Sequence, residues 1–283
     1  MSRLGLGLLV ALVLALAAAS GSTAAAAPKR IVSLSATATE TLFAIGAGKQ
    51  VVAVDAQSDY PKQAPRTRLS YTNPNVEAIA AYKPDLVIVE YDPNGIVASL
   101  RRVGIHVLAQ KAARTFADVY GQIRQLGAAT GHAAQAGALV TRMKTRIAAL
   151  VAKAGPRANG LSVYHELEPD LYSATSTTFI GQIYKLFGLR NIADAADTGG
   201  TGYPKLSPEY IVSQSPDVIV LGDVRCCGQT AKTVAARPGW GQISAVKTGT
   251  IVRVDDSIAS RWGPRIVDFV RAVAAGLAHL RGT

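Results

Sequence analysis

Residues His132–Lys153 read HAAQAGALVTRMKTRIAALVAK and have the length and pattern of one long helix. Its large apolar residues recur at spacings of one, three and four, which places them on one face of a helix: Leu139, Val140, Met143, Ile147, Leu150 and Val151. A helix of this length measures about 33 Å, roughly the width of a small domain. The periodicity predicts either a surface helix of one domain or a rod between two.

Short apolar runs alternate with helical segments on both sides of this helix. Strands are expected at 31–35, 51–54, 86–89 and 105–108 before it, and at 161–164, 218–221 and 250–254 after it. Such alternation is typical of α/β folds with parallel sheets. We expect strand 161–164 to lead into a polar loop over His165–Asp170. The helix therefore joins an N-terminal lobe, 28–131, to a C-terminal lobe, 155–283, with the linking helix over 132–154.

Residues 75–89 and 207–221 repeat each other without a gap. Each segment reads as a helix with an acidic first turn, a Pro-Asp turn and a buried strand, and the matched residues are Glu77 with Glu209, Pro84 with Pro216, and Asp85 with Asp217. This repeat predicts that the two lobes are structural duplicates.

The chain opens on a segment typical of a secretory signal. Residues 1–27 carry Arg3, an apolar run and then small residues, and the run is too short for a comfortable membrane span. Cleavage after Ala19 and cleavage near Ala27 both fit the pattern. No cysteine lies there to carry a lipid anchor. We therefore expect an exported protein without an anchor, soluble outside the cytoplasm.

The 283 residues have a formal charge of +11 and are 49% hydrophobic. The basic residues are scattered and are not interleaved with aromatic ones, so nucleic-acid binding is not expected. The two cysteines, Cys226 and Cys227, are adjacent. They can close a small strained ring, stay reduced, or pair between molecules.

Taken together, these motifs resemble the substrate-binding proteins of ABC importers for vitamin B12, haem and ferric siderophores, and most of all the vitamin B12-binding type. The resemblance covers essentially the whole mature chain. It rests on 30–48 (RIVSLSATATETLFAIGAG), the DYP at 59–61, the repeated Glu helices, RPGW at 237–240 and GPR at 263–265. The first motif departs from the family pattern S-P-S-x-T-E at Ala36, which replaces the proline.

The resemblance implies two Rossmann-like lobes joined by a single long backbone helix, with a ligand bound between them. It also implies a periplasmic or other extracytoplasmic protein, expected to be monomeric, that delivers its ligand to a permease and its ATPase. Glu77 and Glu209 match the carboxylates that dock on the permease in this family. Each can instead simply favour the positive N-terminus of its own helix.

The ligand that this resemblance favours is cobalamin or a related corrinoid, carried as cargo because the protein has no cofactor of its own. Tyrosines in the expected cleft loops offer flat faces to a large ring and hydroxyls to its amides: Tyr60, Tyr71, Tyr91, Tyr172 and Tyr203. Each of them can equally cover the edge of a lobe. Asp256, with its neighbour Asp255, offers acceptors to corrin amides.

Arg261 in the same region is expected to contact the ligand, and Arg265 to do so or to cap its lobe. These arginines and the positive charge keep ferric siderophores open as the alternative ligand. Haem would need an axial ligand, for which His165 is a weak candidate beside the reading of a solvated loop histidine. The four histidines, at 106, 132, 165 and 279, form no three-ligand set, so no metal site of the protein's own is expected.

A secreted hydrolase is the hypothesis from another class of function. The sequence has no G-x-S-x-G elbow and no H-E-x-x-H motif. Glu166 and Glu168, two residues apart in an expected loop, do not establish a pair of carboxylates facing a substrate. We therefore expect no enzymatic activity.

Overall fold

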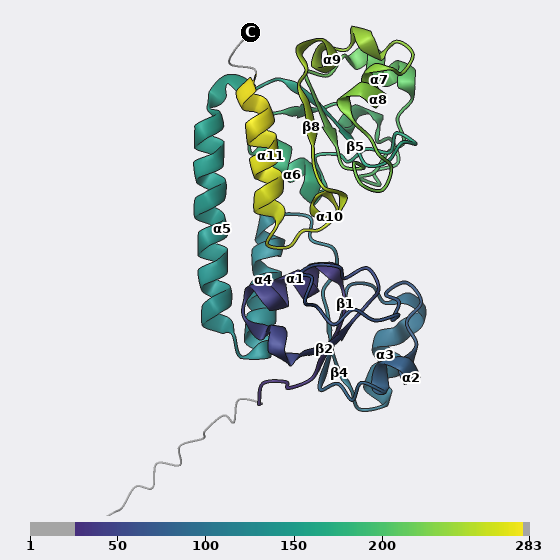
Figure 1. Cartoon of the computed structure of the whole chain (residues 1–283), viewed down its shortest axis with the longest axis vertical. Helices are drawn as coiled ribbons and strands as arrows, with labels where there is room; N and C mark the ends of the chain where they lie inside the picture. The colour runs from purple at the N-terminus through teal and green to yellow at the C-terminus, as the bar shows by residue number, and fades with distance from the viewer. Residues whose placement is uncertain (1–25, 280–283) are drawn as a thin grey trace, which may run out of the picture.

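The computed structural model describes residues 26–279 of the chain. Two lobes lie one above the other, each built on a four-stranded sheet, and the long helix α5, Ala133–Ala154, runs along one side of both (Figure 1). The strand orders are β2-β1-β3-β4 and β6-β5-β7-β8, and every pair within them is parallel. The predicted fold, two α/β lobes joined by one long helix, is confirmed.

The first lobe, called the N-lobe, and the second, called the C-lobe, have the same arrangement. The N-lobe contains β1 (Ile31–Leu34), α1 (Ala36–Ala44), β2 (Val51–Val54), α2 (Val76–Ala80), β3 (Leu86–Val89), α3 (Ile96–Arg102), β4 (His106–Ala109) and α4 (Phe116–Thr130). The C-lobe contains β5 (Ser162–Glu166), α6 (Phe179–Lys185), β6 (Arg190–Asn191), α7 (Pro208–Gln214), β7 (Val218–Leu221), α8 (Ala231–Ala235), α9 (Ser244–Thr248), β8 (Ile251–Arg253), α10 (Asp256–Ala259) and α11 (Ile266–His279).

The repeated segments occupy equivalent places in the two lobes. Asp85, ahead of β3, accepts hydrogen bonds from the backbone N–H groups of Lys29 and Arg30 at the start of β1. Asp217, ahead of β7, accepts one from the N–H of Ser162 at the start of β5. Each aspartate thus ties the first strand of its lobe to the third. The repeat in the sequence therefore corresponds to an equivalent aspartate that holds the strands together in each lobe.

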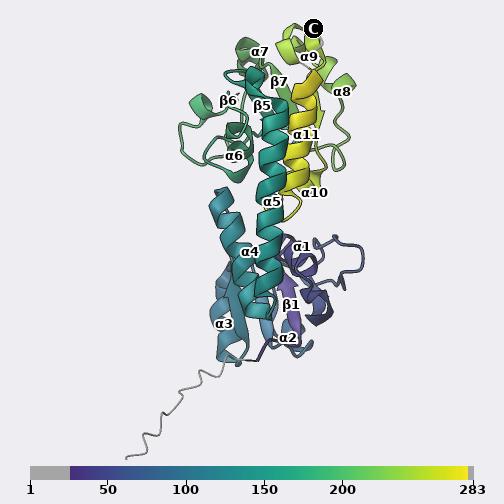
Figure 2. The same ribbon diagram turned by 90° about the vertical axis from the view of Figure 1, so that its left-hand side faces the viewer.

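Helices α4, α5 and α11 join the lobes. At Gly127 of α4 an added Cβ would lie 2.4 Å from the Cβ of Ala136 in α5, so only glycine permits this close approach. The apolar face of α5 covers both lobes, and α11 of the C-lobe lies beside its upper half (Figure 2). Because helices of both lobes share one core, the domain limits 28–131, 132–154 and 155–283 stay a prediction.

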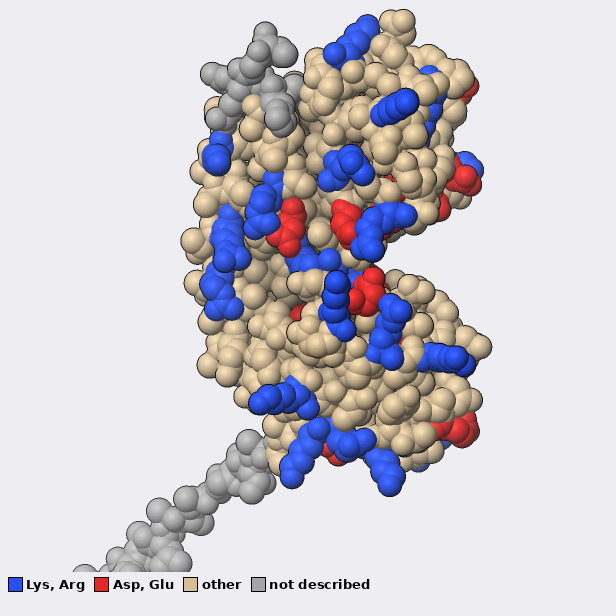
Figure 3. Space-filling view, viewed as in Figure 1, with Lys and Arg blue, Asp and Glu red and all other residues tan. Residues whose placement is uncertain are grey.

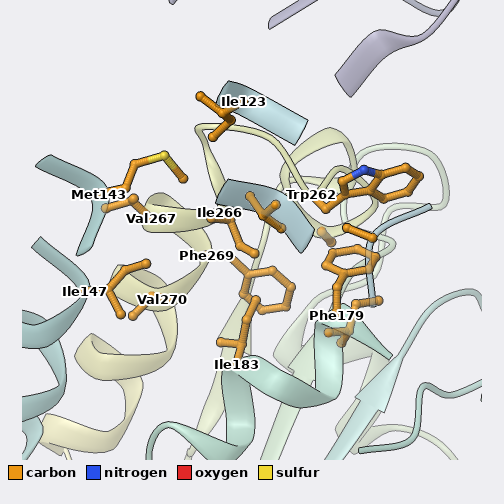
Figure 4. Close-up of a cluster of buried hydrophobic side chains, with 14 of the residues drawn as sticks. Ile123, Met143, Ile147, Phe179, Ile183, Trp262, Ile266, Val267, Phe269 and Val270 are labelled. Carbon is orange, nitrogen blue, oxygen red and sulfur yellow. The ribbon is translucent and has the colours of Figure 1, made fainter. Parts of the chain in front are cut away.

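One hydrophobic cluster continues from one lobe into the other. Ile123 of α4, Met143 of α5, Phe179 of α6 and Phe269 of α11 all belong to it, together with Trp262 from the segment between α10 and α11 (Figure 4). Fully burying side chains of this size stabilises a fold by about 1.5–3 kcal/mol each. Because the core is shared, we expect the lobes to move little relative to each other.

One local prediction from the sequence is wrong. The polar loop predicted to begin at His165 is not observed there, since His165 and Glu166 belong to β5 and are fully buried. Tyr184 contacts His165 Nδ1 and Arg237 binds the Glu166 carboxylate, whereas His165 Nε2 has no hydrogen-bond partner among the described residues.

The signal peptide expected over residues 1–27 lies almost wholly outside the described residues. Over 26–279, no helix combines the length and the apolar character needed to cross a bilayer.

Candidate functional site: the cleft between the lobes

A notch opens between the two lobes on the side away from α5 (Figure 3). Its N-lobe wall is formed where β1 and β3 end, because the order β2-β1-β3-β4 reverses direction between these two strands. Chains that leave such a switch point run apart and leave a crevice at the carboxyl ends of the strands. Ser35 and Ala36 follow β1, and Glu90 and Tyr91 follow β3.

The cavity at this point has a volume of about 700 Å³, including the part open to solvent. The N-lobe supplies most of its lining, and the C-lobe contributes Ser260, Arg261 and Trp262 from the segment after α10. Both lobes therefore shape the same cavity, which is the ordinary position for a ligand in a two-lobed binding protein. We call it the cleft cavity.

Two carboxylates line the N-lobe wall of the cleft cavity. Glu90 accepts a hydrogen bond from Ser35 Oγ at 2.8 Å, and fully buried Asp55 accepts from Ser58 Oγ at 2.8 Å and from the N–H of Gln57 at 2.7 Å. Burial raises the pKa of Asp55 and the pKa of Glu90 above their ordinary values. A ligand that donates hydrogen bonds here would favour the ionised carboxylates.

Tyr71 and Tyr91 form an aromatic pair in the cleft cavity. Their ring centroids lie 5.9 Å apart and the rings are tilted by 37°. Burial of its hydroxyl and the negative charge of Glu90 raise the pKa of Tyr91 to about 12. Tyr91 therefore stays a neutral phenol that can donate or accept a hydrogen bond.

The other predicted tyrosines lie outside the lining of the cavity. Tyr60 carries the guanidinium of Arg265 over its ring at 4.2 Å, and Tyr203 of the C-lobe lies near enough to Tyr91 to affect its pKa. Tyr172 forms a bridge with Lys205, whose ammonium lies 5.5 Å from its ring centroid. The structure therefore brings Tyr71, Tyr91 and Tyr203 together, and does not place Tyr172 with them.

Exposure singles out the same tyrosines. Within residues 26–279 the large apolar side chains left exposed are Tyr60, Tyr91, Val103, Tyr172 and Tyr203. Four of these five are tyrosines that the sequence predicts to bind ligand. Of these, Tyr91 lines the cleft cavity and Tyr203 lies near Tyr91, so their rings are accessible to a ligand there.

Arg261 lines the cleft cavity, but its guanidinium is already bound. It donates to Glu40 Oε1 at 2.9 Å and to the carbonyl of Gln57 at 2.9 Å, and it pairs with Asp59 at 2.8 Å. All three partners belong to the N-lobe. These contacts join the lobes, and the predicted contact of Arg261 with the ligand stays a prediction.

Glu40 of α1 is the centre of this contact between the lobes. Its side chain is 1% exposed, and it binds both Arg261 and Arg265, of which Arg265 also donates from Nε to Glu40 Oε2 at 2.8 Å. A buried carboxylate with two arginines is neutralised by the opposite lobe. Arg265 thus joins the C-lobe to the N-lobe through Glu40, and we call this ion pair the clamp between the lobes.

The C-lobe has its own buried acids at the ends of β5 and β7. Glu166 receives two hydrogen bonds from Arg237, both 2.6 Å long. Asp223 beside them is fully buried, and burial together with the charge of Glu166 raises its pKa well above the ordinary value. The Glu166 side chain is committed to Arg237, which agrees with the absence of a catalytic pair from Glu166 and Glu168.

Asp256 does not face the ligand with free oxygens. One of its carboxylate oxygens accepts from the N–H of Arg225 at 2.8 Å and the other from the N–H of Cys226. Its neighbour Asp255 pairs with the Arg225 side chain at 3.1 Å. Both acids therefore hold the loop that carries the cysteines, which form a Cys226–Cys227 disulfide.

His165 lies too deep to act as a metal ligand in the cleft. Its Nδ1 contacts the Tyr184 hydroxyl at 2.6 Å, and the ring packs on Phe269. Burial lowers the pKa of His165 to about 3, so the ring is neutral. Over the described part of the chain, no group of three His, Cys, Asp or Glu residues is placed to hold a metal ion.

Glu77 and Glu209 lie in the first turns of α2 and α7 and are both exposed. The helix caps are supplied by neighbours, the Asn75 and Ser207 side chains, which accept from the N–H groups of Ala78 and Tyr210. Among residues 26–279, neither glutamate has an ion-pair partner. Each lobe thus presents an unpaired carboxylate at the start of the equivalent helix.

Sequence reasoning missed several residues of the cleft cavity: Ser35, Ala36, Thr37, Asp55, Gln57, Glu90, Ser260 and Trp262. A signal was present for some of them. Ser35, Asp55 and Glu90 each follow directly after an apolar run that ends a strand, which is where parallel sheets place ligand contacts. These side chains are polar, whereas most of the predicted cleft contacts are aromatic.

Comparisons with known proteins agree with this geometry. Residues 31–258 match the family described as "Periplasmic binding protein". The chain is 34% identical over 259 residues to the ABC transporter substrate-binding lipoprotein YvrC of Bacillus subtilis, covering 88% of this chain and 80% of that one. It is 35% identical over 253 residues to the cobalamin-binding protein of Halobacterium salinarum, covering 85% and 67%.

Among solved structures, the chain is similar to the periplasmic heme-binding protein RhuT from Roseiflexus, determined in its apo form. The TM-score is 0.75 and the identity 25%, over 88% of this chain and 97% of that one. The cobalamin-binding relative and this heme-binding structure thus differ in the ligand that their names state.

Proposed function

The chain belongs to the periplasmic binding protein family, and from this premise we propose that its cleft binds cobalamin or a related corrinoid and delivers it to a permease. The family and the relatives show the general role of the protein. The protein is the substrate-binding component of an ABC importer of the vitamin B12, haem or siderophore type, and it works with a permease and an ATPase. It is a solute carrier rather than an enzyme, and it carries a transported ligand rather than a cofactor of its own.

The tyrosines at the cleft carry the proposal for a corrinoid. Tyr71 and Tyr91 pair inside the cavity, and Tyr203 approaches from the other lobe. A corrin is a large ring edged with amide groups, so aromatic faces and phenol hydroxyls suit its body and its rim. The 35% identity to a cobalamin-binding protein supports the same ligand.

The charges in the cleft cavity support an amide-bearing ligand over an anionic one. Asp55 and Glu90 are acceptors, and the cation nearest to them, Arg261, is neutralised by Glu40 and Asp59. Amide N–H groups can donate to these carboxylates, whereas a carboxylate ligand would be repelled by them. Ferric siderophores and haem therefore remain the second candidates, and similarity to a heme-binding structure is what favours haem.

The proposed working cycle uses the joined lobes. The ligand is held between the tyrosines of both lobes, and the shared core permits only a small closure around it. Glu77 and Glu209 then meet cationic groups on the permease, giving one point of electrostatic steering per lobe. We propose that the protein acts as a monomer.

The family acts outside the cytoplasm. We propose that this chain reaches that compartment through the signal segment 1–27 and stays without a lipid anchor, unlike the Bacillus relative, which is described as a lipoprotein. A hydrolytic function has no support from the site or from the relatives.

Replacing Glu90 by Gln should weaken cobalamin binding and flatten its pH dependence. Ligand amides favour ionised Glu90, whose pKa in the free protein is raised above 4.5, so wild-type affinity should fall as the pH drops through that raised value. Loss of a hydrogen bond to a charged acceptor costs about 1.5–3 kcal/mol, roughly tenfold or more in affinity near neutral pH. Titration calorimetry across this pH range measures both effects.

The matched control is Glu168→Gln, which removes an exposed carboxylate that does not line the cleft cavity. It should bind as the wild type does at every pH. Equal affinity and equal pH dependence in Glu90→Gln and wild type would contradict the role of this carboxylate.

A further inference from the structure

The Cys226–Cys227 disulfide lies in the loop between β7 and α8, residues 222–230, called here the cysteine loop. Both cysteines are exposed. The loop leaves the carboxyl end of β7, so it belongs to the edge of the C-lobe sheet that faces the cleft. The ligand contacts proposed for the tyrosines and for Asp55 and Glu90 do not involve this loop.

The cysteine loop is held at the cleft by the acids after β8. The N–H groups of Arg225 and Cys226 donate to the two carboxylate oxygens of Asp256. The Arg225 guanidinium binds Asp255, and the negative charge of Asp59 in the N-lobe also acts on it. Because Asp59 in turn binds Arg261, the loop sits beside the rim of the cleft cavity.

Asp256 connects the loop to the cavity wall. Its carboxylate holds the cysteine loop, while its backbone carbonyl accepts from the Ser260 hydroxyl at 2.7 Å and from the Ser260 N–H at 2.9 Å. Ser260 and the next two residues, Arg261 and Trp262, line the cavity. A change in the cysteine loop is therefore transmitted through Asp256 to Ser260, the first of the C-lobe residues that line the cleft cavity.

A disulfide between neighbouring residues closes a small ring that contains the peptide bond between them. The ring fixes the backbone torsions of both residues, and opening it returns rotational freedom to the loop. Val224 of the loop packs against the C-lobe core, but residues 225–228, which include both cysteines, are exposed and have no such packing to keep their shape. Ordering a loop during binding costs affinity that a preformed loop does not lose.

We propose that the Cys226–Cys227 disulfide is a redox-sensitive element of the ligand site, and that a dithiol reductant lowers ligand affinity by opening it. This rests on the proposed function, since it concerns the same cleft. One thiolate of the reductant attacks a cysteine sulfur and breaks the S–S bond; its second thiol then resolves the mixed disulfide. Two electrons and two protons pass to the cysteines, which become thiols, and the reductant becomes a disulfide.

Affinity of the oxidised and the reduced protein tests this proposal. The mature protein is treated with dithiothreitol, freed of it by gel filtration without oxygen, and titrated with cyanocobalamin, hemin and a ferric siderophore. The reduced form should bind the cognate ligand about fivefold to tenfold more weakly, because the loop must be ordered on binding. The Cys226→Ser/Cys227→Ser variant should match the reduced protein and be insensitive to the reductant.

Amide hydrogen exchange gives a second readout that needs no ligand. Residues 224–230 and 255–261 should exchange faster in the reduced protein, and the loop 197–203 of the same lobe should not change. Equal ligand affinity in both redox forms would overturn the proposal. If the oxidised protein binds none of the ligands, the proposed function fails; unchanged exchange would then overturn the inference, and faster exchange would support it.

Discussion

Replacing Glu40 by Ala should lower the free energy of unfolding by about 3–5 kcal/mol. The Glu40 side chain is 1% exposed, and those of Arg261 and Arg265 are 11% and 14% exposed. Removal of the carboxylate leaves the largely buried Arg265 guanidinium without its ion-pair partner, and it leaves Arg261 with Asp59 alone. Since a domain is typically stable by only about 5–15 kcal/mol, chemical denaturation should show the loss clearly.

Asp268→Ala is the matched control for this change. Asp268 pairs with Arg271 on α11, but these side chains are 41% and 52% exposed, and exposed pairs contribute about 0–1 kcal/mol. Glu40→Gln, which keeps an acceptor and loses the charge, should fall between the two. A loss below about 1 kcal/mol for Glu40→Ala would show that the clamp between the lobes does not stabilise the fold.

Reversing both docking charges, in the Glu77→Lys/Glu209→Lys variant, should abolish uptake and leave ligand binding unchanged. Both carboxylates are exposed and lie outside the lining of the cleft cavity, so neither the fold nor the ligand site depends on them. Like charges placed against cationic groups of a partner cost several kcal/mol, enough to prevent productive docking. Uptake of labelled ligand by cells with the cognate permease, beside calorimetry on the pure variant, measures the two effects separately.

Glu168→Lys reverses an exposed charge elsewhere on the C-lobe and serves as the control. It should transport as the wild type does, and the single variants at Glu77 and Glu209 should give intermediate uptake. Normal uptake by the double variant would remove the docking role from this pair. Lost ligand binding would instead place the glutamates in the ligand site or in the fold.

The fold could be predicted from the sequence because its signals are local. Buried parallel strands read as continuous apolar runs, the repeat at Glu77 and Glu209 exposes the duplication, and the linking helix shows its own periodicity. Each of these signals lies within a few residues of the element that it predicts. The family and the absence of enzymatic function followed from the same motifs.

The contacts between the lobes could not be predicted, because they join residues far apart in the chain. Glu40 and Arg261 are separated by 221 positions, and no local pattern relates them. For the same reason the sequence predicts a ligand contact for Arg261 and does not predict its ion pairs with the N-lobe. The sequence predicts a loop at His165 because a polar pair at the end of a strand is typical of one, whereas inside the core Tyr184 contacts His165 Nδ1 and Arg237 binds Glu166.

The cleft site could be predicted in part. The tyrosines were found from their place after strands, and the structure brings Tyr71, Tyr91 and Tyr203 toward one cavity, while Tyr172 lies with Lys205. Asp55 and Glu90 were missed because carboxylates after strands are common and only burial distinguishes these two. Their contribution to ligand binding stays a prediction.

Calorimetric titration of the mature, oxidised protein with cyanocobalamin, hemin and a panel of ferric siderophores tests the central claim most directly. We predict saturable one-to-one binding of cyanocobalamin alone, weakened when both Tyr71 and Tyr91 are replaced by Ala. Binding of hemin or of a siderophore without cyanocobalamin would leave the fold and the importer role intact and would contradict the corrinoid proposal.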